Sequence, residues 1–394
     1  MLSNYKELQV FRTLEHWKPA RKVISAEELF GPKNNSFPMF NYLYSLTEKT
    51  YSRLPVRKNG ENSFIHPINL VLNLKAARVV DGLILSIALI HDLIEEEVDL
   101  YLQENKLDEK DYKTAEKLDK YEKQAFDKFS RELISFCQQE NVSIAKAEAV
   151  IETLKLLTRH KRHFYYTSIA EIFSCPNKEI KEMAIQVKLA DRIHNVLTIE
   201  EFDEIRRIYE CFKNLFILNN SKKYLLDKFG DAIHFHENFS STEKLFNKCA
   251  KATYDAFLTI CNSCAKKGID DAIPILQLAF KKFEFEISGL YEVTKLNEKE
   301  VHPLRLFQGV VRKYDCILHK EISQFNLLTR KEMDYCSRFF ADYSYSKEQL
   351  RAIIDYKDAY SLKEVIASLL YNPKYFIHQF ICSELSPEGR IIEK

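Results

Sequence analysis

Apolar residues recur every three or four positions along almost the entire chain, a spacing that places them on one face of a helix. Glycine and proline, which interrupt helices and form tight turns, number only 8 and 10 among 394 residues. Long helices joined by short polar turns account for both observations. We therefore predict an all-α fold.

The clearest helical signals lie in the first 230 residues. Residues 83–96 are apolar almost all round as far as Ile90, which predicts one buried central helix. The helix before it has Pro67 in its first turn, where a missing N–H group costs nothing, and it ends at Asp81-Gly82. Asn177 has the side chain of a helix cap. Further helices are predicted at residues 144–157, 179–199, 206–229, 244–261, 271–290, 301–325, 331–340 and 347–370.

The charge balance argues against a nucleic-acid or membrane partner. The formal net charge is +1, which is not that of a protein that coats nucleic acid or binds a membrane surface. No apolar run approaches the roughly 20 residues of a membrane span, and the N-terminus lacks the apolar core of a signal sequence. We expect a cytoplasmic protein that could still bind a small anion through a local basic cluster.

A histidine followed directly by an aspartate, His91-Asp92, interrupts the longest apolar run. On a continuous helix His91 would share a face with Glu95, and Asp92 with Glu96. Burying so many ionisable groups is costly unless a cation or other partners compensate them. One more histidine and one more aspartate from other helices would complete a mixed nitrogen and oxygen set that suits a divalent metal ion.

Four segments in the same order resemble the hydrolase domain of the RelA/SpoT homologues, enzymes of the HD type that degrade guanosine tetra- and pentaphosphate. They are Arg57-Lys58-Asn59-Gly60-Glu61, His66-Pro67, His91-Asp92-x-x-Glu95-Glu96, and Lys-Leu-Ala-Asp-Arg-Ile-His-Asn at 188–195. The resemblance covers about residues 38–230. No match to the family's pyrophosphate-transfer domain follows it, so alarmone synthesis is not expected.

The resemblance implies an activity and a set of site residues. The activity is metal-dependent removal of the 3′-pyrophosphate from (p)ppGpp, which gives GDP or GTP plus pyrophosphate. Glu95 and Glu96 match the acidic pair that handles the proton of the attacking water. The implied ligands of one Mn²⁺, with Fe²⁺, Co²⁺ or Zn²⁺ as alternatives, are His66, His91, Asp92 and Asp191. The implied substrate contacts are Arg57, Lys58, Asn59, Lys188, Asn195 and Thr198.

The chain departs from the family pattern at positions that concern the substrate. Glu96 stands where the family has aspartate, and Leu197 stands where an arginine is usual. A second hypothesis is therefore an HD phosphohydrolase that acts on another phosphorylated nucleotide or cofactor. A third is a nucleotide-sensing regulatory protein that docks a protein partner through residues 231–394. Simpler interpretations also exist, since Glu95 to Glu97 could be a solvated helix end and Arg57-Lys58 a solvated basic turn.

The predicted organisation has three parts. Residues 1–37 form an N-terminal helical extension, residues 38–230 an HD helical bundle, and residues 231–394 a second, all-helical domain of unknown role. Within the bundle, residues 99–131 interleave Lys, Glu and Asp with one apolar stripe, which predicts a solvated helical hairpin or insertion. His194 is predicted to pack or to support the site and not to bind metal.

Overall fold

The computed structural model describes residues 18–57, 60–108, 112–160, 163–199, 202–230, 239–267, 303–372, 374–386 and 389–391. These residues form helices and connecting turns and contain no β-sheet, because the pairing of Leu385 with Ile391 is an isolated bridge. The predicted all-α fold is confirmed. None of the helices in the described ranges is long and apolar enough to cross a membrane.

The chain divides into two compact units. The first comprises Met1–Glu201, Asn219–Cys249 and Phe376–Lys394, and the second comprises Phe202–Leu218 and Ala250–Tyr375. The chain changes unit four times, and none of these changes coincides with the predicted boundary between residues 230 and 231. Two long helices each contribute residues to both units, and helical periodicity does not tell which neighbours a helix will pack against.

The first unit consists mainly of nine helices among the described residues. They are α2 (Ala26–Phe30), α3 (Phe37–Tyr51), α4 (Ile65–Ala76), α5 (Gly82–Ile90), α6 (Leu93–Glu104), α7 (Tyr112–Gln139), α8 (Ile144–Leu157), α9 (Tyr165–Ser174) and α10 (Lys178–Leu197). The ends of α8 and α10 agree with prediction. Asn177 caps α10 as expected, because its side-chain oxygen accepts hydrogen bonds from the N–H groups of Glu179 and Ile180.

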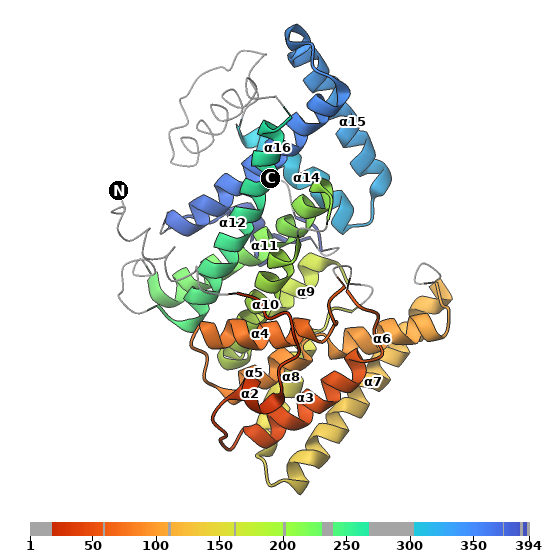
Figure 1. Ribbon diagram of the computed structural model, residues 1–394, viewed down its shortest axis with the longest axis vertical. Coiled ribbons are helices and arrows are strands. Elements are labelled where there is room, and N and C mark those ends of the chain that lie inside the picture. Colours follow the sequence, from red (N-terminus) through yellow and green to blue (C-terminus); the bar gives the residue numbers. More distant parts are fainter. Residues whose placement is uncertain are drawn as a thin grey trace. The chain divides into compact units, whose positions relative to one another are not determined.

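Helix α5 lies at the centre of this unit, in contact with α3, α4, α8 and α10 (Figure 1). Asp81 caps its start by accepting a hydrogen bond from the N–H of Leu83 at 2.8 Å. Gly82 follows, and a Cβ atom there would lie 2.6 Å from Cβ of Ser36, so only glycine fits this close approach. The apolar run thus predicted the buried helix correctly.

The prediction that residues 83–96 form one helix is wrong. Helix α5 ends at Ile90 and α6 begins at Leu93, so His91 and Asp92 form the turn between them. The His91 ring explains the break, because its Nδ1 lies 3.0 Å from the carbonyl oxygen of Ala88, the oxygen that would accept the next helical N–H. Residues Glu95 and Glu96 therefore open a helix instead of closing one.

The charged stretch 99–131 forms the end of α6 and most of α7. These two helices pack against each other, and the ring of Tyr101 stacks on that of Tyr121 with centroids 4.0 Å apart. Helix α7 also packs on α8, so the stretch has one buried face, as its apolar stripe predicts.

The first unit also holds the end of the chain. Asn219 donates from Nδ2 to the carbonyl of Ile377 at 2.9 Å and accepts from the N–H of the same residue at 2.7 Å. Asn220 accepts from the N–H of Cys382 at 2.9 Å. These bonds attach the segment that begins at Ile377 to α11 (Glu204–Phe229). The sequence analysis assigned this segment and α11 to different domains.

Among its described residues, the second unit contains parts of α11 and α12 (Ser241–Ala265) and three further α-helices: α14 (Pro303–Leu318), α15 (Ile322–Phe339) and α16 (Lys347–Tyr371). The predicted break near residues 326–330 is wrong, because the chain turns at Lys320, whose φ is +60°. The N–H of Glu321 closes this turn on the carbonyl of Cys316 at 2.7 Å. The predicted helix 271–290 and residues 1–17 of the N-terminal extension lie outside the described residues.

Candidate metal centre

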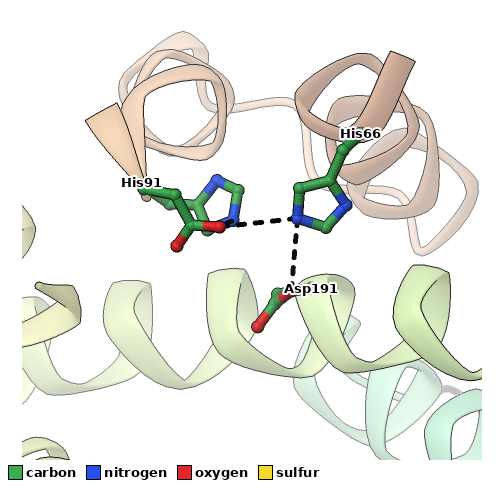
Figure 2. Close-up of side chains that lie close together, drawn as sticks. His66, His91 and Asp191 are labelled. Atoms are coloured by element: carbon green, nitrogen blue, oxygen red, sulfur yellow. Dashed lines mark ion pairs between the residues drawn. The ribbon is translucent and has the colours of Figure 1, made fainter. Parts of the chain in front are cut away.

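Four side chains from separate parts of the first unit meet at one point. His66 comes from the start of α4, His91 and Asp92 from the turn after α5, and Asp191 from α10. Figure 2 shows His66, His91 and Asp191 facing one another across the space between their helices. The structure thus places the four residues that the sequence analysis predicted as ligands close together.

The distances in this cluster suit one cation. One ligand atom from each side chain can be chosen so that all four lie within 4.8 Å of one another. A cation with bonds of 2.0–2.2 Å keeps opposite ligands roughly 4.4 Å apart, so a contraction of a few tenths of an ångström would suffice. Nε2 of His66 lies 3.4 Å from Asp191 and 3.6 Å from Asp92, and Nε2 of His91 lies 2.8 Å from Asp92.

The hydrogen bonds around His91 direct a nitrogen lone pair into the cluster. A carbonyl oxygen can only accept, so Nδ1 of His91 carries the hydrogen that it donates to Ala88. Burial opposes a charge on His91, but the carboxylate of Asp92, 2.8 Å from Nε2, raises the pKa of this ring. When the ring is neutral, as a bound cation would require, its lone pair is on the buried Nε2. A histidine that donates its outer N–H to a backbone carbonyl is the usual arrangement for a metal ligand.

The hydrogen bonds of His194 indicate which ring nitrogen of His66 carries the hydrogen. Nη1 of Arg57 lies 3.3 Å from Nδ1 of His194, and a guanidinium can only donate, so this nitrogen accepts. Burial, with the charges of His66 and Arg57, lowers the pKa of His194 to about 2, so its ring is neutral. Nδ1 of His66 lies 2.8 Å from Nδ1 of His194, so His66 is the donor and carries the hydrogen on Nδ1. A neutral His66 ring, the form that binds a cation, would then have its lone pair on Nε2, facing the two aspartates.

Both aspartates are ionised. Burial opposes the charge of Asp191, but Lys188, whose Nζ lies 3.0 Å from Oδ2, and His66 hold the pKa of this carboxyl well below its usual range. Asn195 donates a further hydrogen bond to Oδ1. Burial likewise opposes the charge of Asp92, and His91 and His66 lower its pKa nonetheless. Two imidazole nitrogens and two carboxylates thus converge, and a cation that displaces the histidine protons could be held by all four side chains.

The acidic pair lies in the first turn of α6, where the helix dipole favours negative charge. The backbone N–H of Arg159 donates to Oε1 of Glu95 at 2.7 Å, and the guanidinium of Arg159 lies 3.9 Å from Oε2. Burial, followed by the charges of Asp92 and Asp99, raises the pKa of Glu96 to about 7. A carboxyl with such a pKa can both accept and release a proton near neutral pH.

The residues predicted to contact the substrate differ in how they are related to the cluster. Arg57 is half-buried and joins the cluster through His194. Lys188 and Asn195 both bind Asp191, and the hydroxyl of Thr198 donates to the carbonyl of His194 at 3.0 Å, within its own helix. Lys58 and Asn59 lie outside the described residues.

Sequence reasoning missed three features of the site. The backbone N–H of Arg159 positions Glu95, although the run around Arg159 has the composition of an exposed turn. Glu97, next to the acidic pair, accepts a hydrogen bond from Thr50 at 2.8 Å and so links α6 to α3. The buried Tyr51 lies near the cluster and carries no motif. All three depend on contacts between helices, for which a single sequence offers no signal.

Comparison with known proteins adds no assignment, since no family model matches the chain and no curated protein matches it. The geometry supports a metal-binding cluster with a neighbouring acidic pair.

Proposed function

We propose that this chain is a metal-dependent phosphohydrolase of the HD type. The observation that carries the proposal is the convergence of Nε2 of His66 and His91 with the carboxylates of Asp92 and Asp191. These four side chains would hold one divalent cation, Mn²⁺ by the resemblance described above. The acidic pair next to the ligands supports hydrolysis over a purely structural metal site, because a closed structural site needs no proton acceptor.

Each side chain has a role that follows from its chemistry. When bound, the cation would acidify a coordinated water and screen the negative charge of the phosphoryl group. Glu96, with its pKa of about 7, would take the proton of the attacking water and release it to the departing oxygen. Glu95 would orient that water from the position in which Arg159 holds it. Arg57 would bind phosphate oxygens through its fork of N–H donors.

The substrate that we propose first is (p)ppGpp, with loss of its 3′-pyrophosphate. Four motifs in the order of the RelA/SpoT homologues support this choice, and the first of them contains Arg57. A second candidate is another phosphorylated nucleotide or cofactor. Leu197, the last residue of α10, favours it, because an arginine is usual at that position in the family and leucine cannot bind phosphate.

Incubation of the full-length protein with Mn²⁺ and guanosine tetraphosphate tests the proposal, with products resolved by ion-exchange chromatography. We expect GDP and pyrophosphate, no reaction in excess EDTA, and a loss of about 10²-fold in rate for Glu95→Gln, which would disturb the position of the attacking water. Glu97→Gln is the matched control, because Glu97 lies two residues away on the same helix but binds Thr50. Its rate should equal that of the unsubstituted protein.

The two candidates give different results in this assay. No turnover of guanosine tetraphosphate, together with turnover of another phosphorylated nucleotide, would exclude the first substrate and keep the phosphohydrolase. Full activity in EDTA, or equal losses for Glu95→Gln and Glu97→Gln, would contradict the proposed site itself.

A further inference from the structure

Tyr51 carries a buried hydroxyl that has no hydrogen-bond partner among the described residues. It is the last residue of α3, and its side chain is only 3% exposed. Buried hydroxyl groups in proteins are almost always hydrogen-bonded, so one that is not calls for an explanation. Nothing in the packing of α3 requires a phenol here, since phenylalanine would fill the same space.

The surroundings of this hydroxyl are those of the candidate metal centre. The carboxylates of Asp92, Glu96 and Glu95 and the guanidinium of Arg57 all act on it electrostatically. Its ring contacts Phe64, two residues before His66, and the neighbouring Thr50 bonds to Glu97, next to the acidic pair, so Tyr51 lies between the segments that carry a proposed ligand and the acidic pair. No other tyrosine of the described residues combines an unpartnered hydroxyl with these neighbours.

The ring of Tyr51 is held in place by its neighbours. It packs against Phe64, with ring centroids 6.1 Å apart, and Thr50 ties the end of α3 to Glu97 on α6. A phenol has an ordinary pKa of about 10 and is therefore a hydrogen-bond donor at neutral pH. Burial and the nearby carboxylates raise the pKa of Tyr51 further. The site thus contains a fixed donor that lacks an acceptor.

We propose that Tyr51 is a further substrate-binding residue, whose hydroxyl donates a hydrogen bond to a phosphoryl oxygen of the bound substrate. This inference rests on the proposed function, because it requires a phosphate group at the metal centre. A phosphoryl oxygen is a strong acceptor, and its negative charge makes such a bond stronger than one between neutral groups. The role would explain why the chain keeps a polar atom at a buried position where it makes no bond within the protein.

Tyr51→Phe tests the proposal, and Tyr44→Phe is a matched control. Both tyrosines lie on α3, both are buried and both contact Phe64, but the hydroxyl of Tyr44 donates to the carbonyl of Ile24 at 2.8 Å. The measurements are the thermal midpoint of the full chain and, by calorimetry, the affinities for Mn²⁺ alone and for pyrophosphate at saturating Mn²⁺.

The two variants should give opposite results. We expect Tyr51→Phe to keep or raise the thermal midpoint, to bind Mn²⁺ normally and to bind pyrophosphate about 10- to 100-fold more weakly, the usual effect of losing a hydrogen bond to a charged group. Tyr44→Phe should bind pyrophosphate normally and melt about 2–4 °C lower, because it loses a satisfied hydrogen bond.

Three results would overturn the inference. One is pyrophosphate affinity of Tyr51→Phe within twofold of the unsubstituted protein. Another is a fall in thermal midpoint like that of Tyr44→Phe, which would show a structural hydroxyl. The third is an unsubstituted protein that binds Mn²⁺ but no pyrophosphate. In contrast, weaker pyrophosphate binding by Tyr51→Phe in a protein that leaves guanosine tetraphosphate intact would keep the Tyr51 assignment and exclude only the first substrate.

Discussion

His194 should control metal affinity without touching the metal. It is buried at 1% exposure, and its Nδ1 is the acceptor for both His66, at 2.8 Å, and Arg57, at 3.3 Å. The bond to His66 keeps the hydrogen of that ring on Nδ1 and the lone pair on Nε2, where the cation would bind. Replacing His194 with phenylalanine removes the acceptor and retains an aromatic ring of similar size.

The expected change in metal affinity follows from the hydrogen bond between His66 and His194. Loss of the group that orients a metal-binding histidine typically lowers metal affinity 10- to 100-fold, which corresponds to about 1.4–2.8 kcal/mol. Two buried donors, on His66 and Arg57, would also lose their acceptor, so the folded state should lose about 1–3 kcal/mol. A variant that removes this acceptor is therefore expected to change affinity and stability together.

A paired variant separates the two effects. His194→Asn retains an acceptor near the position of Nδ1 but leaves a cavity, so it should be destabilised while it binds Mn²⁺ nearly as well as the unsubstituted protein. Calorimetric titration of chelator-stripped protein with Mn²⁺ measures the affinities, and urea unfolding measures the stabilities. If His194→Phe bound Mn²⁺ as tightly as the unsubstituted protein, the assignment of the His66 lone pair through His194 would be refuted.

Two further predictions concern metal binding and pH. Mn²⁺ at 100 times its dissociation constant should stabilise the first unit by about 2.7 kcal/mol, and Asp191→Asn should abolish this effect in thermal unfolding, whereas a stabilised variant would argue against the ligand set. Burial raises the pKa of Asp355 in the second unit to about 6, with Arg351 lowering it and Asp358 raising it. The folded state therefore binds this proton more tightly than the unfolded chain, so stability should fall by up to about 3 kcal/mol as pH rises from about 4 to about 6. Urea unfolding of Asp355→Asn should show a smaller fall, and an unchanged pH profile would contradict the assignment.

The helices that sequence predicted well are those with local end signals. Helices α8 and α10 begin and end close to their predicted limits, because Asn177 caps one and the apolar periodicity stops at the ends of both. The turns at His91 and at Lys320 were missed. Neither contains glycine or proline, and apolar residues continue at helical spacing on both sides. In the first turn, the side chain of His91 hydrogen-bonds to the carbonyl of Ala88. In the second, Lys320 has a positive φ although it is not glycine.

The sequence predicted which residues form the cluster but not how they are oriented. The resemblance to the RelA/SpoT homologues, carried by four motifs in the same order, pointed to the four members of the cluster, and the structure brings them together. The contacts that orient them were not predictable. His66 and His194 are 128 positions apart, and Glu95 and Arg159 are 64 apart, so only the packing of the helices brings each pair together. Contacts between residues so far apart produce no regular spacing that a single sequence would reveal.

The break between α5 and α6 also explains how two consecutive residues can serve one cation. Neighbouring residues on a continuous α-helix point about 100° apart and do not face each other. A single helix through residues 83–96 would therefore direct His91 and Asp92 to different sides. In the observed turn, Nε2 of His91 and Oδ2 of Asp92 lie 2.8 Å apart and face Asp191 together. The same turn places Glu95 and Glu96 at the positive end of α6, so one interruption of the helix creates both the ligand pair and a favourable position for the acidic pair.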